Sequence, residues 1–186
     1  IRINGEAIAD VIRSDQDKPV IEVISNKRQG KYWLVEKELD VPTSIIEEKR
    51  EGIDNRTVSI AFPLPDSVKP AETIFAYLPT SVQSGLDFLV NADFILTSNR
   101  ESVREDLPWN QWLRNCVSEV FLEAFKDLLG NKKYRFYVFK FIPLPNSPRD
   151  SFYQPIVEKI IEDLKSQSIV WTLDGKTNAE PLRTRF

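Results

Sequence analysis

The chain has 186 residues, of which 41% are hydrophobic and 28% charged, an ordinary balance for a folded domain. A net charge of −3 provides no general electrostatic attraction for nucleic acid. The sequence has no histidine and one cysteine, which excludes Ser-His-Asp and Cys-His catalysis, an internal disulfide and a zinc site of the usual composition. We therefore expect an intracellular, cytoplasmic protein in which Cys116 packs inside a helix.

The six glycines are too scattered to form a nucleotide cradle. Rossmann and P-loop motifs cluster glycines so that backbone amides approach the phosphates closely. Residues 174–177 (Asp-Gly-Lys-Thr) end like a P-loop, but Val170 stands where its first glycine belongs, so we expect an ordinary turn. The chain also contains no methionine, which favours a fragment of a longer protein with no complete catalytic site of its own.

The first half of the sequence predicts mainly strands. Residues 6–13 permit one short helix, and the charged residues 43–55 predict a short helix or a long loop. A turn over residues 26–30 is expected to join the first two strands as a hairpin. The β-rich runs are residues 20–24, 31–39, 57–62, 73–78 and 88–97.

The second half predicts helices. Apolar residues recur at helical spacing over residues 109–129, with Glu105 and Asp106 ahead of the helix and Gly130 after it. A second helix is expected over residues 153–166, and a closing strand over residues 169–173. The fold class is therefore predicted to be α+β, a mixed β-sheet with the long helix packed on one face. We expect residues 1–130 to form a middle or transducer-like domain and residues 131–186 a smaller C-terminal α/β part packed on it.

The most distinctive segment follows the run at 88–97. Ser98 and Glu101 fit a capping box that opens a helical turn, which would place Asn99 and Arg100 beside free backbone amides. Such amides together with a guanidinium are a good receptor for an anion such as phosphate. The alternative is that Arg100 pairs with a nearby carboxylate, Glu101, Glu105 or Asp106, and only fixes the loop.

Residues 73–115 resemble sacsin-like proteins, which carry a GHKL-type ATPase module related to heat-shock protein 90. The resemblance lies in an aromatic strand ending in Leu78-Pro79, a Ser-Gly-Leu turn at 84–86, a strand, and the Ser-Asn-Arg sequence at 98–100. Residues 171–175 (Trp-Thr-Leu-Asp-Gly), with Pro181 after them, are similar to a recurrent tail of the same proteins.

The resemblance implies a non-catalytic segment that follows an N-terminal ATPase domain and transmits its nucleotide state in chaperone-like work. ATP and Mg would be held in that N-terminal domain, and client or partner proteins would bind the assembly. By position, Arg100 would reach the ATP phosphate in trans, with Asn99 and Glu101 flanking it. Gln83, in the turn before Gly85, is a weaker candidate for the same surface.

Two other functions stay open. The first is a protein- or peptide-binding scaffold that uses the Pro- and aromatic-rich half and no nucleotide. The second is a single-strand nucleic-acid module using residues 132–135, although we expect the aromatic residues 134–141 to be buried and nucleic acid and membrane not to be partners. An exposed Arg100 favours the phosphate role, and an Arg100 buried among carboxylates favours the scaffold.

Overall fold

The computed structural model describes residues 2–3, 6–7, 9–13, 19–25, 28–65, 67, 73–166, 170–171 and 178–179. Its main sheet is built from β3 (Ala9–Arg13), β4 (Val20–Ser25), β5 (Arg28–Asp40), β6 (Asn55–Pro63), β7 (Thr73–Ala76), β8 (Leu78–Gln83) and β9 (Leu89–Asn91). The helices are α1 (Pro108–Gly130) and α2 (Gln154–Ser166), with short 3-10 helices η1 (Glu48–Arg50), η2 (Val138–Phe141) and η3 (Ser151–Tyr153). Two further strand pairs are β1 (Arg2–Ile3) with β2 (Glu6–Ala7), and β10 (Val170–Trp171) with β11 (Asn178–Ala179).

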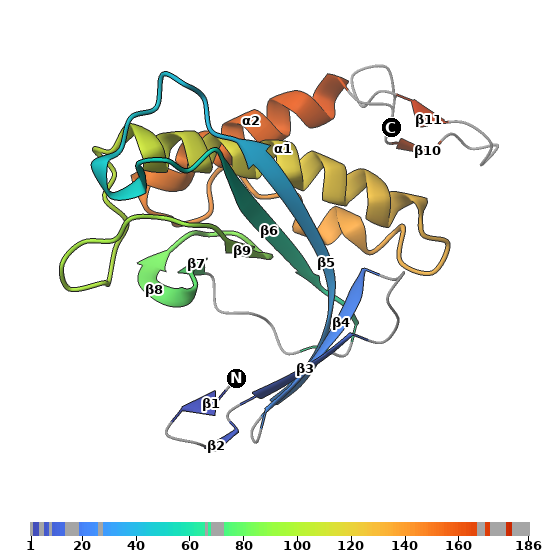
Figure 1. Ribbon diagram of the computed structural model, residues 1–186. Helices are drawn as coiled ribbons and strands as arrows, with labels where there is room; N and C mark the ends of the chain where they lie inside the picture. The colour runs from blue at the N-terminus through green and yellow to red at the C-terminus, as the bar shows by residue number, and fades with distance from the viewer. Residues whose placement is uncertain are drawn as a thin grey trace.

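The predicted α+β class is confirmed. The seven strands follow the order β3-β4-β5-β6-β9-β7-β8, antiparallel except for the parallel pair β7 and β9. Helix α1 crosses β5 and β6, and α2 lies beside α1 on the same side of the sheet (Figure 1). The long pairing of β5 with β6 runs from Tyr32 opposite Pro63 to Asp40 opposite Asn55, and it forms the centre of the sheet.

Helix α1 forms where the apolar spacing predicted it. Pro108 opens it, because the first turn of a helix needs no backbone N–H from that position, and Asn131 ends it by donating its N–H to the Leu128 carbonyl. Phe121 packs edge-to-face on Phe62 of β6, with ring centroids 5.7 Å apart. The fully buried face of α1 therefore locks the helix onto the sheet.

The core continues beyond α1. Val138 and Phe141 of η2, and Ile156 and Ile160 of α2, belong to the same hydrophobic cluster as the sheet residues. The division into residues 1–130 and 131–186 stays a prediction, although both parts contribute to this one cluster. The buried thiol of Cys116 confirms its expected place in the helix core.

Four local predictions were wrong, each because tertiary pairing or turn chemistry overrode a local pattern. Residues 6–7 and 9–13 form strands, since β3 pairs with β4 along its whole length. Strand β5 already starts at Arg28, so the expected turn residue Gly30 lies inside it. The run 73–78 is two strands, because Tyr77 adopts φ 62° and reverses the chain. The run 88–97 is a strand only as far as Asn91.

The remaining expectations have mixed outcomes. Residues 43–54 form a loop that contains η1, whose start is capped by the Glu47 side chain, and Asn55 already begins β6. Of the predicted strand at 169–173, the structure describes Val170–Trp171, and residues 174–177 lie outside the described part. Within the described ranges, neither helix has the length and apolar character that a membrane crossing requires.

Candidate functional site

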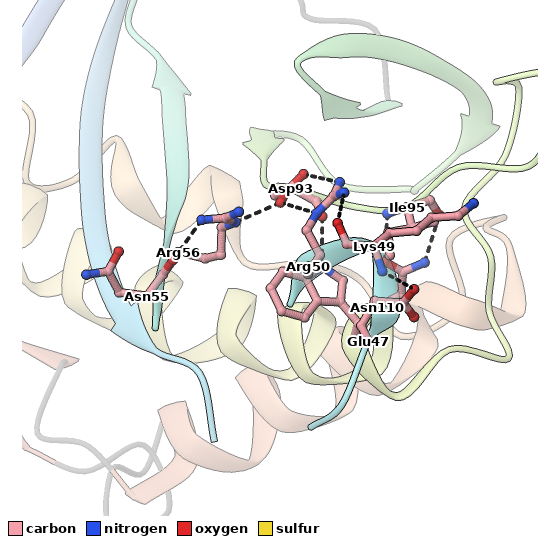
Figure 2. A network of polar contacts seen from close by, with 9 residues as sticks. Glu47, Lys49, Arg50, Asn55, Arg56, Asp93, Ile95 and Asn110 are labelled. Carbon is pink, nitrogen blue, oxygen red and sulfur yellow. Dashed lines mark hydrogen bonds and ion pairs between the residues drawn. The ribbon is translucent and has the colours of Figure 1, made fainter. Parts of the chain in front are cut away.

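A buried carboxylate organises the end of the sheet next to β9. Asp93 accepts two hydrogen bonds from Arg50, through Nε and Nη2, and one from Arg56 Nε, each 2.7 Å long. The Asp93 side chain is 7% exposed, and the two arginine side chains are about one quarter exposed. The two guanidinium groups converge on the carboxylate from η1 and β6 (Figure 2). This geometry fixes Arg50 because its planar fork meets both carboxylate oxygens.

The first turn of α1 binds the backbone of Asp93 and of Ile95, just after β9. Trp109 donates its indole N–H to the Asp93 carbonyl over 2.9 Å, and the Arg56 guanidinium lies 5.8 Å from its ring centre. Asn110 accepts from the Ile95 N–H and donates to the carbonyls of Ile95 and Arg104. The Asn110 side chain thus satisfies the backbone N–H and C=O of Ile95, which lies beyond the end of β9 at Asn91.

These contacts support an open groove of about 690 Å³. We call it the basic groove, because its charged lining residues are four cations, Lys49, Arg50, Arg100 and Arg104. It runs between η1, the tight turn from β7 to β8, and the loop 96–104. The remaining lining residues are Ala76, Tyr77, Leu78, Pro79, Leu96, Thr97 and Ser98.

The four cations differ in how far they are neutralised. Arg50 and Arg56 both bind Asp93. The hydrogen bond from Arg50 to Asp93 raises the pKa of Arg50, with a smaller contribution from Glu47. Arg104 forms a two-pronged pair with Asp106, which raises the pKa of Arg104 and lowers that of Asp106. Among the described residues, the side chains of Lys49 and Arg100 form no ion pair. The basic groove therefore keeps a positive charge suited to an anionic ligand.

The loop that carries Arg100 is a hairpin rather than a helix start. Leu96 pairs with Val103, and Thr97 donates its N–H to the Ser102 carbonyl. The predicted capping box at Ser98 and Glu101 is therefore wrong, since no helix begins in the described part of this loop before Pro108. The Asn99 side chain takes over the local bonding: its oxygen accepts from the Thr97 hydroxyl, and its nitrogen donates to Glu101.

Backbone strain is concentrated at the same groove. Among the described residues, Tyr77 (φ 62°) and Arg100 (φ 60°) are the two non-glycine residues with positive φ, and both line the basic groove. The left-handed conformation costs a non-glycine residue about 1–2 kcal/mol. A strained residue persists only where the surrounding structure holds it in place, and such residues are concentrated at functional sites. Here the Ser81 N–H, which bonds to the Glu101 carbonyl over 2.8 Å, ties the loop to β8.

The structure places the predicted site residues as follows. Arg100 lies in the basic groove, exposed and without a carboxylate partner in the described part of the chain. Asn99 and Glu101 bind each other and support the loop. Gln83 ends β8 outside the groove lining, and its carbonyl accepts from the Asp150 N–H. The alternative pairing of Arg100 with Glu101, Glu105 or Asp106 is not seen in the described part of the chain. Asp106 pairs with Arg104 instead, and Glu101 accepts from the Asn99 side chain.

Sequence reasoning missed Lys49, Arg50 and Arg104, the other cations of the basic groove. They come from a loop about fifty residues upstream and from the far strand of the hairpin, and nothing in their local pattern indicates that they meet. Asp93 was not singled out from the sequence either. A buried aspartate directly after a strand, in a chain without histidine, needs cationic partners, and that was the available signal.

The described residues contain no group of three or more Asp, Glu, Cys or His side chains placed to hold a metal ion. The lining of the basic groove instead suits phosphate oxygens, which arginine binds in pairs through its fork of N–H groups.

No protein-family profile matches the chain, and no solved structure matches it. Over 124 residues, 63% of the chain, it is 33% identical to Protein NO VEIN of Arabidopsis thaliana. The matching stretch covers 4% of that plant protein, so this chain corresponds to a small segment of a much longer relative.

Proposed function

We propose that this chain is a non-catalytic segment of a longer, sacsin-like GHKL-type ATPase, in which Arg100 contacts the phosphate of a nucleotide held by a different domain. The observation that supports the proposal is the state of Arg100. Its side chain is exposed in a concave, cationic surface, and no acidic residue lines that surface in the described part of the chain. A guanidinium with neither a carboxylate nor a packing role is available for an anion that comes from outside.

The role of Arg100 would be electrostatic. Phosphoryl transfer places charge on the oxygens of the transferred group, and an arginine supplied from a second domain stabilises that charge. Lys49 would add attraction at longer range, while Arg50 and Arg104 stay partly neutralised by their carboxylates. The strained backbone at Arg100 would keep the side chain aimed into the groove instead of along the loop.

Other parts of the proposal concern the rest of the protein. ATP and its Mg belong to an ATPase domain elsewhere in the parent protein, and that domain is the first partner of this chain. The similarity to 4% of a long plant protein supports a segment of a larger assembly. The lone buried thiol of Cys116 supports a reducing, intracellular place. The proposal also includes client or partner proteins, which the whole assembly would bind in chaperone-like work.

A protein-binding scaffold is the second candidate, and one observation favours it. Tyr77 and Leu78, on the rim of the basic groove, are 73% and 64% exposed, large values for apolar side chains. An exposed aromatic beside an apolar residue is typical of a protein contact. The two functions are compatible, because a domain that brings a nucleotide to Arg100 must dock on this rim.

The basic groove can be tested on the 186-residue chain with inorganic tripolyphosphate, which carries the charges of an ATP phosphate chain without its base. We expect calorimetry to detect binding that weakens with salt and is at least about tenfold weaker in Arg100→Ala, because alanine cannot make the bidentate hydrogen bonds of the guanidinium. The matched control is Lys165→Gln, an exposed cation on α2, which should bind as the wild type does. Absence of binding at low salt, or equal binding by Arg100→Ala, would refute the anion site.

A further inference from the structure

A second concave surface lies near the C-terminal end of α1, away from the basic groove. Its volume is about 560 Å³, and its lining includes Lys31, Lys133, Tyr134, Phe136, Tyr137 and Lys140. We call it the aromatic groove. Its described lining contains three lysines and three aromatic rings and no acidic residue.

The chain after α1 is built to present these side chains. Asn131 Oδ1 accepts from the N–H groups of Lys133 and Tyr134, and successive i to i+3 hydrogen bonds continue from Tyr134 to Lys140. In such 3-10 turns, residues three apart share a face. Tyr134, Tyr137 and Lys140 therefore line up on the groove side.

The opposite face of the same turns is buried. Val138 and Phe141 are 0% and 3% exposed, and Phe141 stacks on Phe62 with ring centroids 4.6 Å apart. The groove side is consequently fixed by the hydrophobic core behind it. Phe136 is 65% exposed, and the segment that carries it is anchored in the core through Val138 and Phe141. The expectation that the aromatic run is buried holds for Phe141 but is wrong for Phe136.

Each aromatic ring of the groove has a cation beside it. The ammonium of Lys133 lies 4.8 Å from the Tyr134 ring centre, and that of Lys140 lies 4.5 Å from the Tyr137 ring centre. The guanidinium of Arg135 lies 4.9 Å from the Phe136 ring centre. Stacking rings that alternate with cations are the arrangement that single-stranded nucleic acids use, bases on the rings and phosphates on the cations.

Two nearby carboxylates limit how much charge the groove carries. Glu22 stands opposite Lys31 across β4 and β5, and Asp127 accepts the indole N–H of Trp33, whose ring contacts Tyr134. Lys133 and Lys140 have no ion pair within the described residues. These two lysines therefore supply most of the electrostatic attraction of the groove.

We propose that the aromatic groove binds single-stranded nucleic acid without sequence preference. Charge favours a polyanion over a neutral partner, and the exposed ring of Phe136 favours one with flat faces. An acidic peptide would use the lysines but would gain little from the ring. This site is independent of the anion role of Arg100, since the two grooves share no lining residue in the described part of the chain.

The test uses the 186-residue chain and a fluorescent oligothymidylate of about ten nucleotides, within the span of known single-strand modules. We expect binding at low salt, and Phe136→Ala to weaken it about tenfold, because one base–ring stack supplies a large part of such affinity. Leu144→Ala is the matched control, since Leu144 is 67% exposed and lies outside the groove. Both substitutions are at the surface, and equal melting temperatures would verify that the fold is retained.

Two further variants separate charge from stacking. The double variant Lys133→Gln/Lys140→Gln should flatten the dependence of log affinity on log salt by about 1.4, since each phosphate that a lysine no longer neutralises lowers the slope by about 0.7 on a single strand. Arg100→Ala should leave oligonucleotide binding unchanged, and Phe136→Ala should leave tripolyphosphate binding unchanged. The proposal is overturned if the oligonucleotide does not bind, if Phe136→Ala behaves like Leu144→Ala, or if polyglutamate competes as well as an unlabelled oligonucleotide.

Discussion

The Asp93 cluster makes a strong prediction about stability. The change is Asp93→Asn, which keeps the size and shape of the side chain and removes its charge. The carboxylate accepts three hydrogen bonds of 2.7 Å from Arg50 and Arg56. An amide has one oxygen for these donors, and its own N–H group would face a guanidinium N–H. At least one donor would lose its acceptor.

The expected loss follows from burial. Removing one partner of a buried ion pair costs about 3–5 kcal/mol, because the charges left behind are desolvated and unpaired. The two arginine side chains are 25% and 24% exposed, so water partly compensates and the lower end applies. We expect the free energy of unfolding to fall by about 3 kcal/mol. For a chain of this length that is a decrease in melting temperature of about 6–12 °C.

Urea denaturation followed by circular dichroism measures this change, provided that the slope with urea concentration stays constant. Asp106→Asn is the matched control: it removes a carboxylate from an equally two-pronged pair with Arg104, but Asp106 is on the surface and 65% exposed. It should leave the midpoint of unfolding unchanged. If Asp93→Asn changes stability no more than Asp106→Asn does, the cluster does not hold this end of the sheet.

Three other predictions concern the core, a turn and the thiol. Phe121→Ala should lower the free energy of unfolding by about 3–5 kcal/mol in the same urea assay, because it removes a fully buried ring and leaves a cavity among its neighbours Phe62, Phe88 and Phe125; a loss below about 1 kcal/mol would contradict the packing. Gly85→Ala should destabilise by more than about 1 kcal/mol, since Gly85 has φ +66° and a Cβ there would stand 2.8 Å from the Pro148 carbonyl oxygen; unchanged stability would show that this turn is not as described. Burial raises the pKa of Cys116 to about 12, so at pH 8 the thiol stays protonated, and a thiol reagent should modify the native chain at least about a hundredfold more slowly than the urea-unfolded chain; equal rates would contradict burial.

Most of the regular elements could be predicted because their local apolar pattern agrees with the face that the fold buries. The helices at residues 109–129 and 153–166 carry long apolar stripes, and the run at 57–62 is a buried strand, so local pattern and tertiary burial agree. The failures lie where one tertiary contact decides. The expected strand at 88–97 ends at Asn91, and beyond it the backbone of Ile95 bonds to Asn110, from a helix fifteen residues later, which no local pattern indicates.

The candidate site was predicted only in part. Arg100 could be found, because it stands in a recognisable motif on a short loop between two elements. Its neighbours in the basic groove, Lys49 and Arg50, could not be found, since their distance from Arg100 in sequence is large and no pattern joins them. The conformation of Arg100 was missed because a capping box and a tight hairpin share the same residues, and only the pairing of Leu96 with Val103 separates them.

The central claim is that Arg100 reaches a nucleotide phosphate held by another domain. The most direct measurement is ATP turnover by the longer protein that contains this chain, wild type against Arg100→Ala, with nucleotide binding measured in parallel and Lys165→Gln as the control. We expect Arg100→Ala to lose most of the turnover, on the order of a thousandfold as for other arginines supplied to a phosphoryl group, while nucleotide binding is retained. Unchanged turnover in Arg100→Ala, or no turnover in the wild type, would contradict this claim and leave the chain as a binding scaffold.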